Sequence, residues 1–357
     1  MEVSRIMRIK IAFVFLLFEM LFDSALCASW ERVLYKNTDC IALNPITHTM
    51  FVGVFNEGIY RTNLEGKGWE NIRFGPGPAL SVHCLAIDPN NPKIIYAGTD
   101  KGLFKSNDGG WGWKKLSIFA ANIAIDPRNS EVVYADRYKS TNGGLSWSQI
   151  IQSAYHTFDV AVDGKSGILY YTGSILSEKS RGLYRSSDGG VTWKKLLDQT
   201  VTVIVIDSRR PGRIYVGGEG KVYRSLDGGD SWVDLEEGLP QGLIHSMLID
   251  PLNPNIIYAG VDMAGVYRSE DGGETWSLLG KGFPDTVKIM DLAIDPSSPD
   301  FLYAATISGV AFGNEYGLWR MELPPRKPFH SVSPLGKLPG MWGGIKMDGG
   351  LNPLKRR

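Results

Sequence analysis

The pattern Ser-x-Asp-Gly-Gly-x-x-Trp recurs along this chain at intervals of about forty residues. Four copies are complete, and a fifth has Asn142 in the acidic position. A degenerate copy at 62–69 has Leu64 there. Self-similarity at such a period marks a repeat architecture, in which each unit is one supersecondary element. The acidic positions are Asp108, Asn142, Asp188, Asp227 and Asp271, and the aromatic positions are Trp113, Trp147, Trp193, Trp232 and Trp276.

Each repeat has the composition of four short strands. In one unit, the runs 84–87, 94–98, 102–106 and 113–116 are rich in β-branched and aromatic residues, and Asp-Pro, Asn-Pro or Gly-Gly pairs separate them. The first run of every unit is apolar on both alternating faces, which predicts a sheet buried on both sides. Sheets stacked radially achieve this and leave only short, protected edges. We therefore predict an all-β, seven-bladed β-propeller of four-stranded antiparallel blades over residues 28–323.

The seventh unit lacks a fourth strand, because Pro324 and Pro325 follow its third run at once. The missing run is found near the start of the chain, where Trp-Glu-Arg-Val-Leu at 30–34 matches Trp-Lys-Lys-Leu-Leu at 193–197. The N-terminal strand is therefore expected to complete the last blade and to close the ring.

The Asp-Gly-Gly turn is suited to a structural role. Glycine supplies the positive φ of a tight turn, the Asp side chain binds N–H groups within its own turn, and the Trp covers it. The repeated acidic residues are therefore predicted to be structural. In each third run a basic residue follows an aromatic one, as in Tyr184-Arg185. These cations either form a surface for an acidic partner or pair with the neighbouring blade.

The two ends of the chain differ in composition from the repeats. Residues 1–27 begin with basic residues, continue with an apolar run at 11–18 and end with small residues before the expected cleavage site. This order is typical of a cleaved signal peptide. This predicts a secreted or periplasmic protein; a lipid anchor on Cys27 is the alternative, although Leu26 stands where a small residue is expected. Residues 324–357 are basic and rich in Pro and Gly, which predicts a disordered tail. The tail either solubilises the chain or contacts an anionic membrane surface.

Cys40 and Cys84 remain once residues 1–27 are removed. They occupy the same position in the first strands of adjacent blades. In an oxidising compartment they form a disulfide or stay as two buried thiols, and the sequence leaves both states open.

A polar set lies at the channel end of the first strands. It consists of Asp39, His83, Asn122, Asp159, His245, Ser246 and Asp291, with His156 nearby. Converging carboxylates and imidazoles can bind a ligand or transfer protons, whereas a solvated channel mouth is polar without any chemistry. No His-x-His, His-x-x-x-His or Cys-x-x-Cys spacing indicates a metal, and we predict no metal and no cofactor. Asp159 and Asp291 are the candidate catalytic carboxylates if the chain cleaves glycosidic bonds.

The repeats resemble the BNR or Asp-box repeat of sialidases, sortilin-type receptors, xyloglucan-active glycosidases and photosystem II assembly factors. The resemblance covers residues 30–323 and implies a propeller, without specifying what it does. The sialidase Arg-Ile-Pro motif is not found, and the xyloglucan-active enzymes place their carboxylates between two propellers. The plan is closest to the photosystem II assembly factors, which are single exported propellers without catalytic apparatus.

These observations favour an exported, non-catalytic and monomeric scaffold. Its expected partner is another protein, which it binds while assisting assembly of a membrane or envelope complex, and no nucleic acid is involved. The competing prediction is a carbohydrate-binding or glycoside-hydrolase-like propeller, which takes a glycan.

Overall fold

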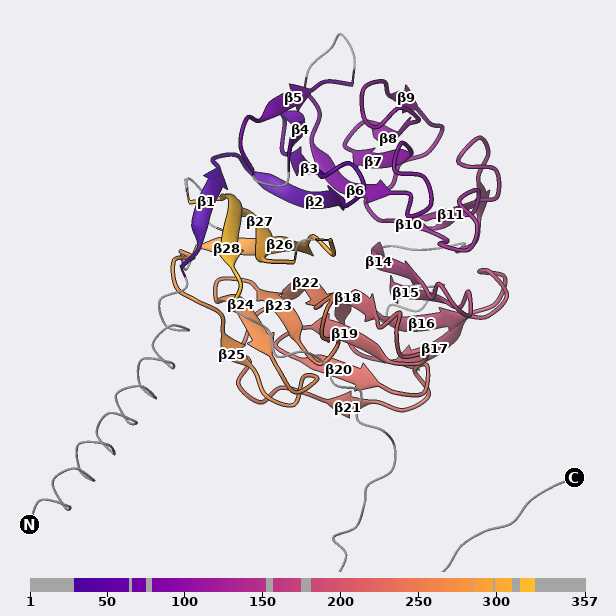
Figure 1. The fold of residues 1–357 in the computed structure, drawn as a ribbon. Helices are drawn as coiled ribbons and strands as arrows, with labels where there is room; N and C mark the ends of the chain where they lie inside the picture. The colour runs from indigo at the N-terminus through magenta and orange to yellow at the C-terminus, as the bar shows by residue number, and fades with distance from the viewer. Residues whose placement is uncertain are drawn as a thin grey trace, which may run out of the picture. The chain divides into compact units, whose positions relative to one another are not determined.

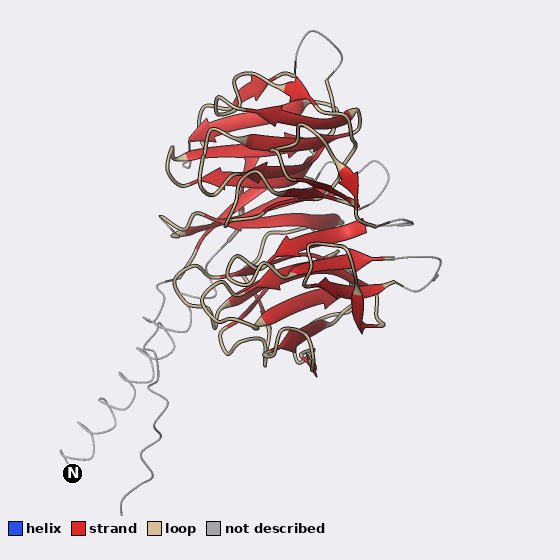
Figure 2. Cartoon of the chain, turned by 90° about the vertical axis from the view of Figure 1, so that its right-hand side faces the viewer, coloured by secondary structure: helices blue, strands red, loops and turns tan. Residues whose placement is uncertain are grey.

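A computed structural model describes residues 29–63, 66–74, 79–151, 157–174, 181–284, 286–297, 299–309 and 315–324. Over these residues the chain consists of strands and loops (Figure 2), and none of them belongs to a helix with the length and hydrophobicity of a membrane span. The predicted signal peptide and the predicted tail beyond Pro324 lie outside the described residues.

The described strands form seven antiparallel sheets of four strands each, arranged around a centre (Figure 1). In the first six sheets the four strands follow one another along the chain, from the centre outward. Blade 1 comprises β2 (Thr38–Asn44), β3 (Thr49–Val54), β4 (Gly58–Asn63) and β5 (Glu70–Ile72). Blade 2 comprises β6 (Val82–Ile87), β7 (Ile95–Thr99), β8 (Gly102–Ser106) and β9 (Lys114–Lys115). Blade 3 comprises β10 (Ile123–Ile125), β11 (Val133–Ala135), β12 (Tyr138–Ser140) and β13 (Ser148–Gln149).

The next three blades repeat this order. Blade 4 comprises β14 (Thr157–Val162), β15 (Leu169–Gly173), β16 (Gly182–Ser186) and β17 (Lys194–Leu197). Blade 5 comprises β18 (Val201–Ile206), β19 (Ile214–Gly218), β20 (Val222–Ser225) and β21 (Val233–Asp234). Blade 6 comprises β22 (Ile244–Ile249), β23 (Ile257–Val261), β24 (Gly265–Ser269) and β25 (Ser277–Leu278). The second strands β7, β15, β19 and β23 are buried along their whole length, because neighbouring blades cover both of their faces.

Blade 7 joins the two ends of the propeller. It comprises β26 (Val287–Ile294), β27 (Phe301–Ser308), β28 (Gly317–Glu322) and β1 (Glu31–Leu34). Strand β1 pairs antiparallel with β28, with Glu31 opposite Arg320. Trp30 is 5% exposed, and its indole N–H donates to the carbonyl of Leu279 in blade 6 at 2.9 Å. The predicted seven-bladed, all-β fold and its closure by the N-terminal strand are both confirmed.

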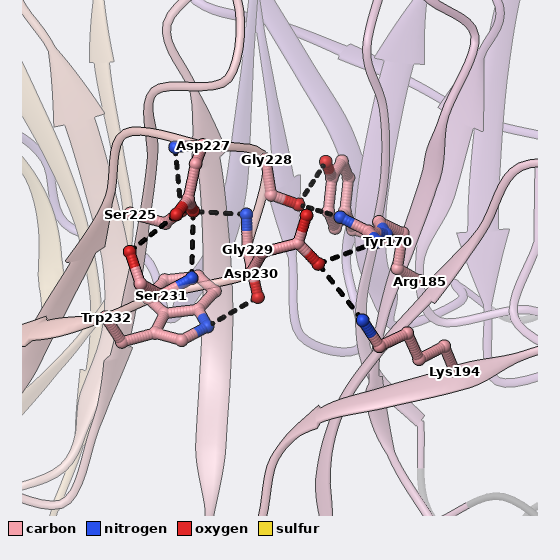
Figure 3. A network of polar contacts seen from close by, with 10 residues as sticks. All are labelled: Tyr170, Arg185, Lys194, Ser225, Asp227, Gly228, Gly229, Asp230, Ser231 and Trp232. Carbon is pink, nitrogen blue, oxygen red and sulfur yellow. Dashed lines mark hydrogen bonds and ion pairs between the residues drawn. The ribbon is translucent and has the colours of Figure 1, made fainter.

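The turn between the third and fourth strand of blade 5 shows how the repeated motif folds (Figure 3). The Ser225 hydroxyl donates to Asp227 Oδ1 at 2.8 Å and accepts from the Gly229 N–H at 2.7 Å. Asp227 Oδ1 also accepts from the Ser231 N–H at 2.9 Å. The Trp232 indole donates to the Gly229 carbonyl at 3.0 Å. The motif residues therefore satisfy one another's polar groups inside a single turn.

Glycine is required in this turn because the backbone has a positive φ and because there is no room for a Cβ atom. Gly229 has a φ of 97°, and a Cβ there would lie 2.5 Å from Leu196 Cδ1 of blade 4. The preceding blade also binds the turn directly (Figure 3): Tyr170 and Arg185 donate to the Gly228 carbonyl at 3.0 and 2.8 Å. The motif therefore joins adjacent blades in addition to closing its own turn.

Four cations of the third strands take part in the same inter-blade contact, whereas Arg268 pairs with Glu270 and Arg320 with Glu31 inside their own blades. Each of the following side chains donates to a glycine carbonyl in the turn of the next blade: Lys105, Lys139, Arg185 and Arg224. The Arg61 guanidinium instead lies 3.7 Å from the centre of the Trp111 ring in blade 2. Contact with the neighbouring blade, one of the two roles that the sequence left open, is thus observed for five of these cations.

Candidate functional site

The first strands are irregular where they reach the channel. In six of the seven blades the pairing of the first and second strand shifts by one residue at this end. Such a bulge sets two residues of one strand against one of its neighbour and re-aims a side chain. Both members of each of the following pairs line the channel as a result: Asp39-Cys40, His83-Cys84, Phe158-Asp159, Thr202-Val203, His245-Ser246 and Met290-Asp291.

The channel holds a cavity of about 290 Å³. Residues from every blade line it, and they include the predicted polar set Asp39, His83, Asn122, Asp159, His245, Ser246 and Asp291. His156 lies outside the described residues. The structure therefore brings the described members of the set to one cavity, as the alignment of the repeats predicts.

Asp159 has both carboxylate oxygens occupied by backbone donors. The Val160 N–H donates to Oδ1 at 2.8 Å, and the Ile204 N–H of blade 5 donates to Oδ2 at 2.9 Å. Burial raises the pKa of Asp159 to about 7, although these hydrogen bonds act in the opposite direction; the charge of Asp291 adds a smaller rise. The carboxyl group thus links the first strands of blades 4 and 5.

Asp291 makes the same connection between blades 7 and 1. The Leu292 N–H donates to its Oδ1 at 2.8 Å, and the Ile41 N–H of blade 1 donates to its Oδ2 at 2.8 Å. The Ser246 hydroxyl lies 3.4 Å from Oδ1. Burial raises the pKa of Asp291 to about 6. Because this link crosses the junction where the ring closes, we assign Asp291 a structural role there.

The two histidines of the cavity each face a carboxylate. His83 Nδ1 lies 2.9 Å from Asp39 Oδ2, and the hydrogen bond to Asp39 raises the pKa of His83. His245 Nε2 lies 3.2 Å from Asp262 Oδ2. Protonation of either imidazole therefore creates an ion pair at the channel mouth instead of an isolated positive charge.

Cys40 and Cys84 are free thiols in the structure. The Cys40 thiol donates to the Val82 carbonyl of blade 2 at 3.8 Å, and burial raises the pKa of both thiols. A Cβ on Gly53 or Gly98 would collide with the facing sulfur, so the glycine opposite each cysteine provides the space for it. A disulfide between them stays a prediction, and titration of thiols in the unfolded, unreduced protein tests it.

Several residues of the cavity were not predicted from the sequence. Cys40, Cys84, Phe158 and Met290 line it at or beside the bulged positions of their strands. Within the described ranges, no group of three or more His, Cys, Asp or Glu is arranged to hold a metal ion. The described polar residues of the lining supply hydrogen-bond donors and acceptors and titratable side chains.

Comparison with known proteins agrees with this architecture. A family model for the BNR/Asp-box repeat matches residues 267–278. The chain is thus a seven-bladed β-propeller that carries BNR/Asp-box repeats. A xyloglucanase from a Paenibacillus species is 29% identical over 143 residues, which cover 36% of this chain and 14% of the xyloglucanase. The chain therefore corresponds to a small part of that relative's length.

Two solved structures are similar in fold. The GH74 enzyme of Niastella koreensis superposes with a TM-score of 0.65 at 18% identity, covering 79% of this chain and 53% of the enzyme. YCF48 bound to D1 peptide superposes with a TM-score of 0.61 at 13% identity, covering 84% of this chain and 97% of YCF48. At these identities the likeness shows the fold alone.

Proposed function

We propose that this chain is an exported, non-catalytic propeller that binds another protein, and that it assists assembly of a membrane or envelope complex in this way. The observation that carries the proposal is the use of the channel carboxyls: Asp159 and Asp291 each accept backbone hydrogen bonds on both oxygens, one of them from the next blade. Carboxyls engaged in this way hold neighbouring blades together, and this inter-blade role supports a structural rather than a catalytic use of the channel.

The binding face in this proposal is the one that carries the channel mouth and the connections between blades. The Phe55 N–H donates to the Asn37 carbonyl at 2.9 Å, which places the β3–β4 turn beside the entrance to β2. Phe55 is 48% exposed, and Phe119, in the connection from blade 2 to blade 3, is 63% exposed. Exposed aromatic side chains on connecting loops are typical of protein-binding surfaces. The likeness to YCF48 bound to D1 peptide supports the view that a single propeller of this length can hold a peptide.

Export is the part of the proposal that rests on residues 1–27 alone. N-terminal sequencing of the protein purified from its source tests it: a mature start near residue 28 supports cleavage, and an intact Met1 contradicts it.

A second candidate, a glycoside-hydrolase-like activity, is favoured by the sequence match to the xyloglucanase. In this alternative Asp159, with its pKa of about 7, would be the proton donor and Asp291 the second carboxylate. It requires the substrate to reach both carboxyls inside the channel, beside the backbone donors that they already bind.

The test is capture of a partner with a matched pair of variants. Tagged residues 28–357 are incubated with detergent-solubilised membranes of the source, and the captured proteins are identified by mass spectrometry. We expect a near-stoichiometric membrane protein that is lost with Phe55→Glu/Phe119→Glu. It should be retained with Leu145→Glu/Leu226→Glu, which alters the Asp-box turns at the other end of the strands, where these residues are 75% and 64% exposed.

The opposite result is equally specific. If wild-type protein captures nothing and releases reducing sugar from xyloglucan, and if Asp159→Asn/Asp291→Asn abolishes that release, the chain is an enzyme and the binding proposal is wrong.

A further inference from the structure

A groove of about 650 Å³ lies between blades 4 and 5. Leu197, Tyr223 and Trp232 supply its apolar surface, and Glu219 and Asp234 are among its polar lining residues. We infer that this groove is the docking site for an aromatic side chain in a basic segment of the partner protein. The inference rests on the proposed function, because it names the part of the partner that the propeller binds.

Two other blade junctions have an aromatic side chain at the position of this groove, and they support the inference. Between blades 1 and 2, the ring of Phe74 lies 4.7 Å from that of Phe104 and 5.1 Å from that of Trp113, measured between ring centres. Phe104 is the third-strand aromatic residue of blade 2, and Trp113 is its motif Trp. An aromatic side chain from the connection between blades thus fills the space in front of these two residues.

The junction of blades 6 and 7 repeats this arrangement. The ring of Phe283, from the connection, lies 5.3 Å from that of Trp319 and 4.4 Å from that of Trp30. Trp319 and Trp30 hold the positions in blade 7 that Phe104 and Trp113 hold in blade 2. The fold therefore places an aromatic side chain against this pair of positions twice.

At the junction of blades 4 and 5 the same two positions are Tyr223 and Trp232, and they line the open groove. The connection there is Asp-Gln-Thr at 198–200, which contains no aromatic or aliphatic residue to insert. Tyr223 is accordingly only partly buried, whereas its counterparts Phe104 behind Phe74 and Trp319 behind Phe283 are each 8% exposed. The groove is thus shaped for a side chain that the chain supplies elsewhere and does not supply here.

Charge indicates what should flank that aromatic side chain. Lys221 pairs with Asp234 at 2.8 Å and with Glu236 at 2.9 Å, and Glu219 is a further carboxylate of the lining. Three carboxylates against one ammonium group leave this side of the groove negative. In the chain's own inserted segments a basic residue also precedes the aromatic one, as Arg73-Phe74 and Lys281-Gly282-Phe283. A basic residue beside the aromatic one is therefore complementary to the groove.

The probe is a capped peptide with the sequence of residues 71–76, Asn-Ile-Arg-Phe-Gly-Pro, labelled for fluorescence anisotropy. We expect saturable binding to residues 28–357, weakened about tenfold or more when Ala replaces Phe in the peptide, which corresponds to about 1.4 kcal/mol. Gln199→Phe should fill the groove in cis and weaken binding to the same extent. Gln199→Ala removes the same amide without filling the groove and should leave binding unchanged. Unaltered thermal midpoints establish that both variants fold.

Equal binding of the Phe and Ala peptides, or equal binding by wild type and Gln199→Phe, overturns the inference. The partner-capture experiment distinguishes failure of the groove inference from failure of the proposed function. A partner that is retained by Gln199→Phe overturns the groove and leaves the proposed function intact. No captured partner together with saturable, Phe-dependent peptide binding overturns the proposed function while supporting the groove as an aromatic site.

Discussion

Aspartate side chains accept backbone hydrogen bonds both in the Asp-box turns, called the rim below, and in the channel. Their pKa values nevertheless shift in opposite directions. At the rim, Asp188 Oδ1 accepts backbone N–H bonds from Val191 and Thr192 at 3.0 and 2.9 Å, and hydrogen bonding lowers the pKa of this exposed carboxyl. In the channel, Asp159 accepts two backbone N–H bonds at 2.8 and 2.9 Å, yet its pKa rises to about 7. Asp188 also accepts hydroxyl hydrogen bonds from Thr192 and Ser186, which lower its pKa in water, whereas burial outweighs the hydrogen bonds of Asp159.

The difference separates two structural roles. A rim aspartate is an anion that completes a local turn, and every blade can carry one without affecting the others. A channel aspartate joins two blades, and its ionisation opposes folding because little solvent surrounds it. The Asp-box aspartate therefore stabilises a single blade, and the channel aspartate, found in two first strands, stabilises the contact between blades.

Deletion of the strand that closes the ring should lower the free energy of unfolding most. The channel depends on ring closure, whereas each Asp-box turn is formed within its own blade. Deletion of 29–34 exposes the partners of Trp30 and Leu34, which are 5% and 7% exposed, and should cost on the order of 5 kcal/mol. Hydrogen exchange should show loss of protection at the channel amides of Ile41 and Leu292, with the rim amide of Gly229 still protected. Equal loss at both places would show that rim and channel unfold as one unit.

Replacement of the channel carboxyl should have the next largest effect. Asp159→Ala leaves two inward-facing N–H groups without an acceptor and should lower the free energy of unfolding by about 2–4 kcal/mol. Asp159→Asn keeps one acceptor and should cost about 1–2 kcal/mol. Urea denaturation measures both values, with Asp188→Ala as the rim control. A rim variant that destabilises as strongly as the channel variant would contradict the comparison.

The pH dependence should differ in sign between the two regions. The folded protein binds more protons than the unfolded chain where a carboxyl pKa is raised, so Asp159 and Asp291 should make stability fall as pH rises from about 4 to about 7. The lowered pKa of Asp188 acts oppositely: its stabilisation is present at neutral pH and is lost as pH falls below about 4.

Denaturation midpoints between pH 4 and 8 measure these slopes. Asp159→Asn/Asp291→Asn should remove the fall, on the order of 2 kcal/mol per carboxyl once access of channel water is allowed for. Asp188→Asn should leave the fall in place and remove only the acid-side loss. Identical slopes in wild type and the double variant would show that these carboxyls ionise freely in the folded protein.

The smallest effect is expected at the one turn with an amide. Asn142 Oδ1 accepts from the Ser146 N–H at 2.9 Å, and its Nδ2 donates to the Ser146 hydroxyl at 2.8 Å. After Asn142→Asp the hydroxyl can donate instead, as Ser231 does to Asp227 Oδ2 at 2.5 Å. The free energy of unfolding should change by less than about 0.5 kcal/mol. A thermal scan that shows a larger shift would mean that charge at the rim acts beyond its own turn.

The sequence predicts the blades, the turns and the ring closure because each is repeated or completes a repeat. The polar positions of the channel are also predictable, since Asp159 and Asp291 align in equivalent first strands. The bulges are not predictable in this way, because they depend on backbone pairing. Cys40 and Met290 are not in the predicted set of cavity residues, because that set contains only the polar side chains of the aligned positions. The groove beside Trp232 was missed for a related reason: an unfilled space becomes evident only when the contacts of Phe74 and Phe283 are known.

The closure of blade 7 sets the order of events during folding. Arg32 must pair with Trp319, and nearly the whole propeller separates them along the chain. Blades 1 to 6 contain only strands that are close in sequence and can form as synthesis proceeds, whereas ring closure has to wait for the last repeat. Until then Trp30 and Leu34 have no β28 to pack against, and the apolar face of the sixth blade that blade 7 covers is exposed. The slowest folding phase should therefore be the joining of β1 to β28, and aggregation should compete most strongly during that interval.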